Sequence, residues 1–275
     1  MSKFTIGADP EICLVDNEGN LKSAIPFIEG TKQEPTPLPS GGNVQRDNVA
    51  CEFGIVPAET VEGFIKNVQT TMREVLDYLP NNLRFFQCAS VLFPETELDC
   101  DEAKQFGCDP DYNAWNMGQV NACEGGDNRA NQCLRSFGGH IHIGYVTGSG
   151  NDFLLEDEGR CATIAVMDAL IGTRSVLLDK SPGSAERRKL YGQAGAFRPT
   201  DYGVEHRSLS NFWIFDEKYM KEIYRLADEA LRIVREGLVD DLFKVVKPKF
   251  IMGCINNSDK GMASNVWNAV KTFIS

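Results

Sequence analysis

The sequence lacks the features of several classes of protein. Its 275 residues contain no uninterrupted apolar run of about 18 residues, so no membrane-spanning helix is expected. Residues 1–4 lead directly into a strand-like run, which predicts that there is no signal peptide and that the protein is cytoplasmic. Internal repeats and low-complexity linkers are also missing. We therefore expect a single catalytic domain over residues 1–275.

Positive charge is in short supply. Lysine and arginine number 28 against 39 aspartates and glutamates, which gives a formal net charge of −11. Binding to a phosphate backbone needs a basic surface, so we expect no generic nucleic-acid binding. A nucleotide held by a few local arginines remains compatible with this composition.

Cysteine pairs with the spacing of a zinc site are missing, although nine cysteines are present. Cys100, Cys108, Cys123 and Cys133 lie in one polar stretch, but they do not form the short paired knuckles of structural zinc sites. Without a secretion signal, the pattern favours reduced thiols that are free or packed in the interior.

Hydrophobic periodicity predicts strands interleaved with helices. Apolar positions at helical spacing predict helices over residues 61–79, 153–179 and 216–239. Strand-like runs cover residues 3–15, 48–56, 83–93, 137–145 and 203–214. Loops are expected over residues 20–46, 94–134 and 183–203, which are rich in polar residues, Gly or Pro. This order predicts an α+β fold.

Four of these strands carry polar side chains in apolar surroundings. A strand turns residues i and i+2 to the same face, so three pairs should share a face: Asp9 with Glu11, His140 with His142, and Glu205 with Arg207. Glu52 lies within the fourth strand, five residues after Asp47, so a bulge or a loop is needed to bring both to one face. His206 and Ser208 should point away from Arg207.

Taken singly, each pattern is also typical of a solvated sheet face, a buried histidine or an ion pair. Together they are more specific, because the only three histidines of the chain lie in two of the four segments. Several carboxylates on one buried face repel each other and stay ionised only beside cations. Oxygen ligands with an occasional imidazole favour Mg²⁺ or Mn²⁺ over zinc.

Arginines follow in a glycine-rich segment, where they could meet phosphate oxygens. Arg187 and Arg188 are adjacent in a turn-rich stretch, and one of the two is expected to face water. Arg198 lies between apolar Phe197 and the last polar strand. Surface arginines on a flexible loop are the alternative reading of this segment.

Four motifs resemble those of one superfamily. GADPEICLVD, ACEFGIVPA, GGHIHIGY and YGQAGAFRPTDYGVEHRSLSNFW resemble, in this order, the acidic, His-x-His and Glu-x-Arg strands of glutamate–cysteine ligases and glutamine synthetase. The set is most similar to the phage phiEco32-like carboxylate–amine ligases (COOH-NH2 ligase type 2, amidoligases), over residues 4–215. The resemblance implies a curved antiparallel sheet with a concave active-site face and helices packed outside.

The resemblance also implies ATP and Mg²⁺ (or Mn²⁺) as cofactors, with two ions. One ion would be held by Glu11, Asp47 and Glu52, and the second by Asp9, His140 and Glu205. The nucleotide would lie beside His142, Arg187, Arg198 and Arg207, and the transferring phosphoryl group would face Arg207, Arg198 and Arg188. Two departures from the family pattern are Asp9 in place of Glu, and Pro10, which favours an edge strand or a bulge.

The similar ligases join a small-molecule or peptide carboxylate to an amine. The carboxylate attacks ATP and becomes an acyl phosphate, and the amine then displaces phosphate, so ADP and phosphate are the expected products. We expect four residues of the segment 107–116 to line the amine pocket: Asp109, Asp111, Asn113 and Trp115. A loop held by its Asp-Pro turn explains the same segment equally well.

Three other functions stay open at this stage. A phosphotransferase on the same sheet would phosphorylate a small guanidino or carboxylate substrate and form no amide. A non-catalytic nucleotide-binding phage protein would show no turnover. A metal-dependent amide hydrolase would need no ATP. In the ligase reading, the protein acts in the cytoplasm, which is the host's if a phage encodes it.

Overall fold

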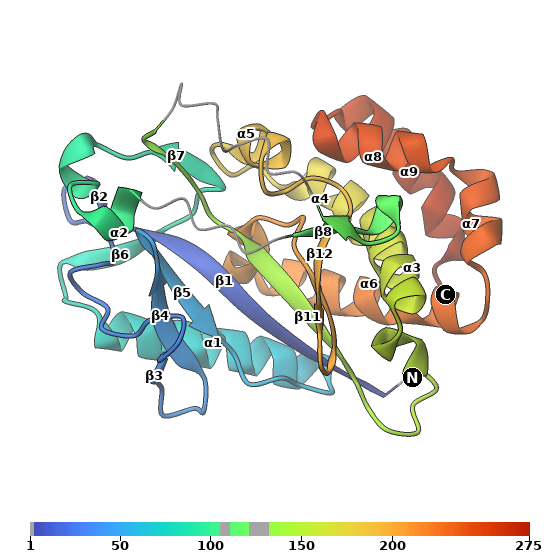
Figure 1. The fold of residues 1–275 in the computed structure, drawn as a ribbon, viewed down its shortest axis with the longest axis horizontal. Coiled ribbons are helices and arrows are strands. Elements are labelled where there is room, and N and C mark those ends of the chain that lie inside the picture. The colour runs from blue at the N-terminus through green and yellow to red at the C-terminus, as the bar shows by residue number, and fades with distance from the viewer. Residues whose placement is uncertain (1–2, 105–110, 121–131) are drawn as a thin grey trace.

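The computed structural model of the chain describes residues 3–104, 111–120 and 132–275. A large antiparallel sheet runs through it in the order β3-β4-β5-β1-β11-β13-β12-β8-β9, and β2 and β6 pair with the far end of β1 (Figure 1). A second, two-stranded sheet joins β7 to β10. The strands are β1 (Phe4–Asp16), β2 (Leu21–Lys22), β3 (Thr36–Pro37), β4 (Asn43–Asp47), β5 (Ala50–Gly54), β6 (Leu83–Phe86), β7 (Ser90–Leu92), β8 (Tyr112–Asn113), β9 (Gln119–Val120), β10 (Leu134–Ser136), β11 (Gly139–Tyr145), β12 (Ala196–Thr200) and β13 (Gly203–His206).

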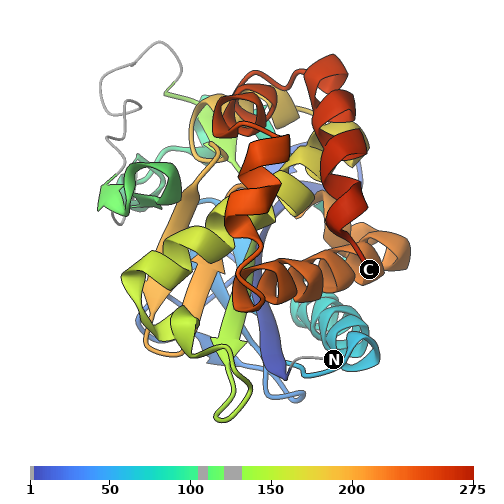
Figure 2. The same cartoon turned by 90° about the vertical axis from the view of Figure 1, so that its right-hand side faces the viewer.

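Helices cover one face of the large sheet. Helix α6 packs against α1 and α3, and α1 and α3 contact strands of the sheet. Helices α8 and α9 form an outer layer on α4, with α7 against α9 (Figure 2). The α+β architecture with a large antiparallel sheet and helices outside it agrees with the predicted class. The helices are α1 (Val61–Tyr78), α2 (Asp101–Lys104), α3 (Asp157–Met167), α4 (Thr173–Leu178), α5 (Ser184–Lys189), α6 (Glu217–Arg235), α7 (Val239–Val245), α8 (Pro248–Asn256) and α9 (Lys260–Val270).

Strand β1 lies in the middle of the sheet and contributes side chains to both faces of the sheet. Its alternate side chains Phe4, Ile6, Ile12 and Leu14 are at most 1% exposed and join the hydrophobic core. Side chains of opposite parity face away from that core. The predicted strand over residues 3–15 is confirmed, and its alternation separates packing residues from polar ones.

Helix α1 forms where the apolar periodicity predicts it. The side chain of Thr60 caps its first turn by accepting a hydrogen bond from the backbone N–H of Gly63. Phe64, Val68 and Val75 are buried against the core, and the helix ends before Pro80. The predicted helix over residues 61–79 is therefore confirmed, as are the helix near 216–239 and the strand near 137–145.

Residues 43–54 form a β-hairpin, which corrects the predicted loop and single strand. Strands β4 and β5 pair with Gln45 opposite Glu52, and Asn48 takes a positive φ of 54° in the turn. Asp47 lies two residues after Gln45, so its side chain and that of Glu52 share a face. Neither a bulge nor a pre-strand loop is needed, because the two acids belong to neighbouring strands.

Other predicted boundaries are wrong because the elements are short. The segment expected as a loop over 183–203 holds helix α5 and strand β12, and the strand expected over 203–214 ends at His206. A short 3₁₀ helix follows over Asn211–Phe215. The run over 83–93 divides into β6 and β7. Elements of three to six residues show too little periodicity to be recognised from the sequence.

Pro10 does not place β1 at an edge, which corrects another expectation. Strand β1 pairs with β11 from Phe4 to Pro10 and with β5 at Glu11 and Ile12. The backbone N–H of Glu11 donates to the carbonyl of Gly138 beside β11, so the nitrogen of Pro10 faces the β5 side. The missing backbone N–H of Pro10 therefore interrupts only the hydrogen bonds between β1 and β5, at a position that lies between Asp9 and Glu11.

The helical segment Asp157–Leu178 contains a π-helical turn. It joins α3 to α4 through Asp168–Gly172, and it agrees with the predicted helix over 153–179. By length and composition this segment is apolar enough to cross a membrane, but 78% of its apolar window is buried inside the protein. Burial of this extent is typical of a core helix.

Candidate active site

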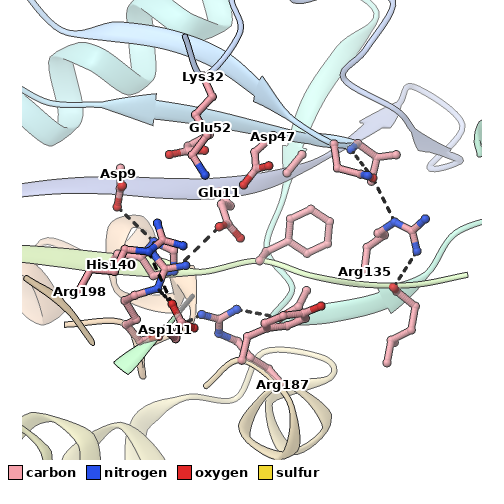
Figure 3. Close-up of a pocket in the computed structure, with 18 residues that line it drawn as sticks. Asp9, Glu11, Lys32, Asp47, Glu52, Asp111, Arg135, His140, Arg187 and Arg198 are labelled. Atoms are coloured by element: carbon pink, nitrogen blue, oxygen red, sulfur yellow. Dashed lines mark hydrogen bonds and ion pairs between the residues drawn. The ribbon is translucent and has the colours of Figure 1, made fainter. Parts of the chain in front are cut away.

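A pocket on the sheet face away from the helices gathers most of the predicted polar residues (Figure 3). Its walls come from β1, β4, β5, β10, β11 and β12, together with α5 and residues beside β8 and β13. Acidic and basic groups line it together. Its charged and imidazole side chains are Asp9, Glu11, Asp47, Glu52, Asp111, Lys32, Arg135, Arg187, Arg198, Arg207 and His140.

Strand register brings three of the predicted metal ligands together. Glu11 on β1 lies directly opposite Glu52 on β5, and the β4–β5 hairpin adds Asp47 on the same face. Burial raises the pKa of Glu52 well above its usual value, and the charges of Asp9, Asp47 and Glu11 raise it further. Burial and the charge of Glu11 also raise the pKa of Asp47. Burial and mutual repulsion therefore both disfavour the ionised forms of these two acids.

A second group surrounds His140. Its Nδ1 lies 3.3 Å from Oδ1 of Asp9 and 3.5 Å from Oε1 of Glu205, and its Nε2 lies 3.9 Å from Oε1 of Glu11. Glu11 is also anchored through its other oxygen, which accepts a hydrogen bond of 2.6 Å from the backbone N–H of Gly138. His140 therefore touches carboxylates of both predicted metal sites.

His142 joins the same group from β11, two residues after His140 and on the same face of the strand. Its Nε2 lies 3.1 Å from Oδ1 of Asp9, and its Nδ1 lies 2.6 Å from the hydroxyl of Tyr202. Burial alone would raise the pKa of Asp9, but the charges and hydrogen bonds of His142 and His140 outweigh it and hold that pKa well below its usual value. Among the described residues, Asp9, His142 and Glu205 place one donor atom each within 4.8 Å of one another, a spacing that suits a metal ion.

Arg207 is held by two carboxylates at the edge of the pocket. Its Nε lies 2.8 Å from Oδ1 of Asp111, and its Nη1 contacts Oε1 of Glu205. Burial would lower the pKa of Arg207, but the charges of Glu205 and Asp111 outweigh it and hold the pKa above its usual value. Arg198 lies opposite Glu205 on β12, with its Nε 3.7 Å from Asp111. The guanidinium of Arg207 therefore stays charged beside the acidic cluster.

Arg187 and Arg188 are both buried, at 2% and 4% exposure, so the expectation that one of them faces water is wrong. Arg187 lines the pocket, but its donors reach Ser136 Oγ and the carbonyls of Leu209 and Arg207. Burial lowers the pKa of Arg187 to about 10. Arg188 does not line the pocket, because its guanidinium lies 3.6 Å from Asp179. Its predicted contact with a phosphoryl group is not supported by this position.

The predicted amine-pocket residues are divided by the structure. Asp111 lines the pocket, whereas Asp109, like Cys108 and Cys123, lies outside the described residues. Asn113 does not line it, and its side chain bonds the backbone of Trp115 and Ala194 instead. Trp115 donates from Nε1 to Asp168 on the helix side of the sheet. Neither residue is placed to meet an amine beside Asp111.

Several residues of the site region gave no clear signal in the sequence. Lys32 lines the pocket from the segment expected as a loop over 20–46. Arg135 lines it from β10, between the loop expected over 94–134 and the strand expected over 137–145, and donates to the carbonyls of Gln132, Leu134 and Ala103. Asp168 is the only charged residue in the apolar run IAVMDALIG, and this isolation was a signal that it has buried partners. The seven cysteines of the described part of the chain are free, as expected.

Comparisons with known proteins agree with the resemblance seen in the motifs. Residues 132–238 match the family described as "Phage phiEco32-like COOH.NH2 ligase-type 2", and this segment carries the His-x-His and Glu-x-Arg strands. No curated protein matches the chain.

Two solved structures resemble the chain at low identity. A bifunctional glutathione synthetase from Pasteurella multocida is 12% identical with a TM-score of 0.47, over 98% of this chain and 49% of that one. A novel glutamine synthase homolog is 14% identical with a TM-score of 0.41, over 99% and 68%. The chain thus spans about half the length of the glutathione synthetase.

Proposed function

We propose that this chain, whose residues 132–238 match the phiEco32-like COOH-NH2 ligase family, is an ATP-dependent carboxylate–amine ligase. The observation that carries the proposal is the convergence in one pocket of carboxylates from β1, β4 and β5 with His140 and Arg207. Acids alone would suit a cation, and arginines alone would suit an anion. Both together suit a nucleotide phosphate bound through divalent ions.

The acidic cluster fits divalent cations on its own chemistry. Hard cations prefer carboxylate oxygens, and burial together with neighbouring carboxylates raises the pKa of Glu52 and of Asp47, so a bound cation would favour the ionised form of both acids. Glu11, Asp47 and Glu52 would hold one ion, and Asp9, His140 and Glu205 the second, with His142 close enough to replace or join His140. Bound ions would neutralise phosphate oxygens while phosphoryl transfer takes place.

The proposed reaction needs no nucleophile from the protein. An oxygen of the substrate carboxylate attacks the γ-phosphorus of ATP, and the bond from that phosphorus to the β–γ bridging oxygen breaks, which releases ADP. The amine nitrogen then attacks the carbonyl carbon of the acyl phosphate, the carbon–oxygen bond to phosphate breaks, and the amine loses a proton. In this scheme Arg207 and Arg198 stabilise the charge of the transferring group.

The proposed substrates are a small-molecule or peptide carboxylate and an amine, and the proposed location of the enzyme is the cytoplasm. A phosphotransferase on the same residues is the second candidate, because the pocket features that favour ATP and metal ions do not themselves require an amine. The two functions differ in one observable, which is the amine dependence of ADP formation.

The experiment is incubation with ATP, Mg²⁺ and pooled amino acids and polyamines. We expect ADP and phosphate to form only when a carboxylate and an amine are both present, with a product whose mass is the sum of the two substrates less one water. Glu11→Gln, His140→Ala and Glu205→Gln should abolish this product. ADP formation with a phosphorylated product and no amine requirement would indicate the phosphotransferase, and the absence of nucleotide binding would indicate a binding module without activity.

A further inference from the structure

A buried carboxylate lies on the opposite side of the sheet from the pocket. Asp168 is 0% exposed and begins the π-helical turn Asp168–Gly172 between α3 and α4. Isolated acids are seldom fully buried, since desolvation of the charge is costly unless hydrogen bonds replace the lost water. Single π-helical turns within α-helices frequently occur at functional sites. Both features indicate that the hydrogen-bond partners of Asp168 are important to the structure around it.

Four groups surround the Asp168 carboxylate. Oδ2 accepts hydrogen bonds from Nε1 of Trp115 at 2.8 Å and from the backbone N–H of Gly195 at 2.5 Å. Oδ1 accepts one from the hydroxyl of Ser208 at 3.1 Å, and Nε2 of His206, which is also 0% exposed, lies 2.9 Å away. One side chain thus satisfies partners from three separate segments of the chain.

Each of these partners is close in sequence to a charged residue of the pocket. Trp115 follows Asp111 by four residues, Gly195 precedes Arg198 by three, and His206 and Ser208 flank Arg207. Strand β13 ends at His206 and Arg207 follows it directly, so contacts that hold His206 and Ser208 restrict the direction of the Arg207 side chain between them. The same three segments meet in the pocket, where Asp111 contacts Arg207 and lies near Arg198.

We propose that Asp168 is a positioning residue, which holds Asp111, Arg198 and Arg207 in register from the reverse face of the sheet. This inference rests on the proposed function, because that function assigns the binding of the reacting phosphate to Arg198 and Arg207. A side chain on a packed helix is a rigid anchor, and small displacements of catalytic groups are costly for rate. The contacts of Asp168 tie together the segments of β8, β12 and β13, which lie toward the β9 edge of the sheet. At that edge, strand pairing alone gives these segments less support than in the middle of the sheet.

The test is Asp168→Asn, which preserves the volume of the side chain but replaces one acceptor oxygen with an NH₂ group. We expect kcat to fall by about 10- to 100-fold with a smaller change in the KM for ATP. The ¹⁵Nε–¹Hε resonance of Arg207, assigned by its loss in Arg207→Lys, should shift as the contact with Asp111 changes. This resonance needs no turnover, so it tests the positioning claim even if the protein proves not to be a ligase.

Two further variants make the result specific. Glu229→Gln is the matched control, because Glu229 is 8% exposed and accepts hydrogen bonds from Arg232 and Ser275 in a region that does not line the pocket. It should lose stability without change in kcat or in the Arg207 resonance. If Asp168→Asn does not fold, Trp115→Phe removes one donor and keeps the ring packed beside Phe243, and it should shift the same resonance. An unchanged Arg207 resonance and parental kcat in the folded variants would overturn the proposal.

Discussion

Arg207→Lys should lower the rate of ADP formation by about 10²–10³-fold, the effect typical of removing one preorganised donor from a charge-stabilising site. Lysine keeps the positive charge but has no planar fork of donors. In the parent, one guanidinium spans the carboxylates of Asp111 and Glu205 and lies 3.4 Å from Nδ1 of His140. An ammonium group has its three donors on one nitrogen, so it cannot span the two carboxylates and present a donor to a phosphoryl oxygen in the geometry of the planar guanidinium.

The comparison is steady-state kinetics of both proteins at saturating ATP and Mg²⁺. Arg174→Lys is the matched control, because Arg174 pairs with Glu222 at 2.6 Å between α4 and α6, and it does not line the pocket. The control should keep the parental rate. A parental rate in Arg207→Lys itself would remove Arg207 from the reacting centre and would contradict the proposed charge stabilisation.

Glu52→Gln should stabilise the metal-free protein and weaken its binding of divalent ions. The pKa of Glu52 is raised in the folded state above that of the unfolded chain, so folding is opposed once the carboxyl ionises. The stability of the parent relative to the variant is therefore highest below the ordinary glutamate pKa and falls as the pH rises through the raised value.

The measurement is urea unfolding of both proteins in EDTA between pH 5 and pH 8. The advantage of Glu52→Gln should grow steadily with pH, because only the parent must bury a charge as its carboxyl ionises. Addition of Mn²⁺ should stabilise the parent more than the variant, because ligand binding to the folded state adds to its stability. Equal stabilisation of the two proteins by Mn²⁺ would show that Glu52 does not ligate the ion.

In the same unfolding experiment, Glu229→Gln should change the stability of the protein in the opposite direction to Glu52→Gln. Burial would raise the pKa of Glu229, but hydrogen bonds from Ser275 and Arg232 outweigh it and lower the pKa below its usual value. This carboxylate therefore stabilises the protein above the pKa of the unfolded chain, and that stability is lost as the pH falls through the folded value. Its replacement should destabilise the protein at neutral pH, with or without Mn²⁺.

Strand periodicity predicted which acids and histidines share a face. Asp9 with Glu11 and His140 with His142 follow the two-residue repeat, and β1 and β11 pair so that Asp9 lies opposite His140. These pairs were predictable because alternation is a local property of an extended chain. The hairpin that brings Asp47 beside Glu52 was not predicted, because its turn at Asn48 has no Gly to mark it.

The arginines show what local pattern could not predict. Arg187 and Arg188 are adjacent, yet one lines the pocket and the other pairs with Asp179 beneath it. Trp115, expected to meet a substrate, donates instead to Asp168, which no spacing in the sequence connects to it. The contact of Trp115 with Asp168 joins residues 53 positions apart and depends on how helices pack on the sheet.

The sequence by itself determined the polar repeat of four strands, the two long helices that begin near residues 61 and 217, and the excess of acids over bases. These properties depend on local pattern or on composition, so they can be predicted without knowing which residues are neighbours in space. Only the tertiary structure decided which carboxylates meet, which arginine reaches them, and which residue supports them from behind. Those outcomes depend on strand order and register, because a shift of a single residue would turn each polar side chain to the other face of the sheet.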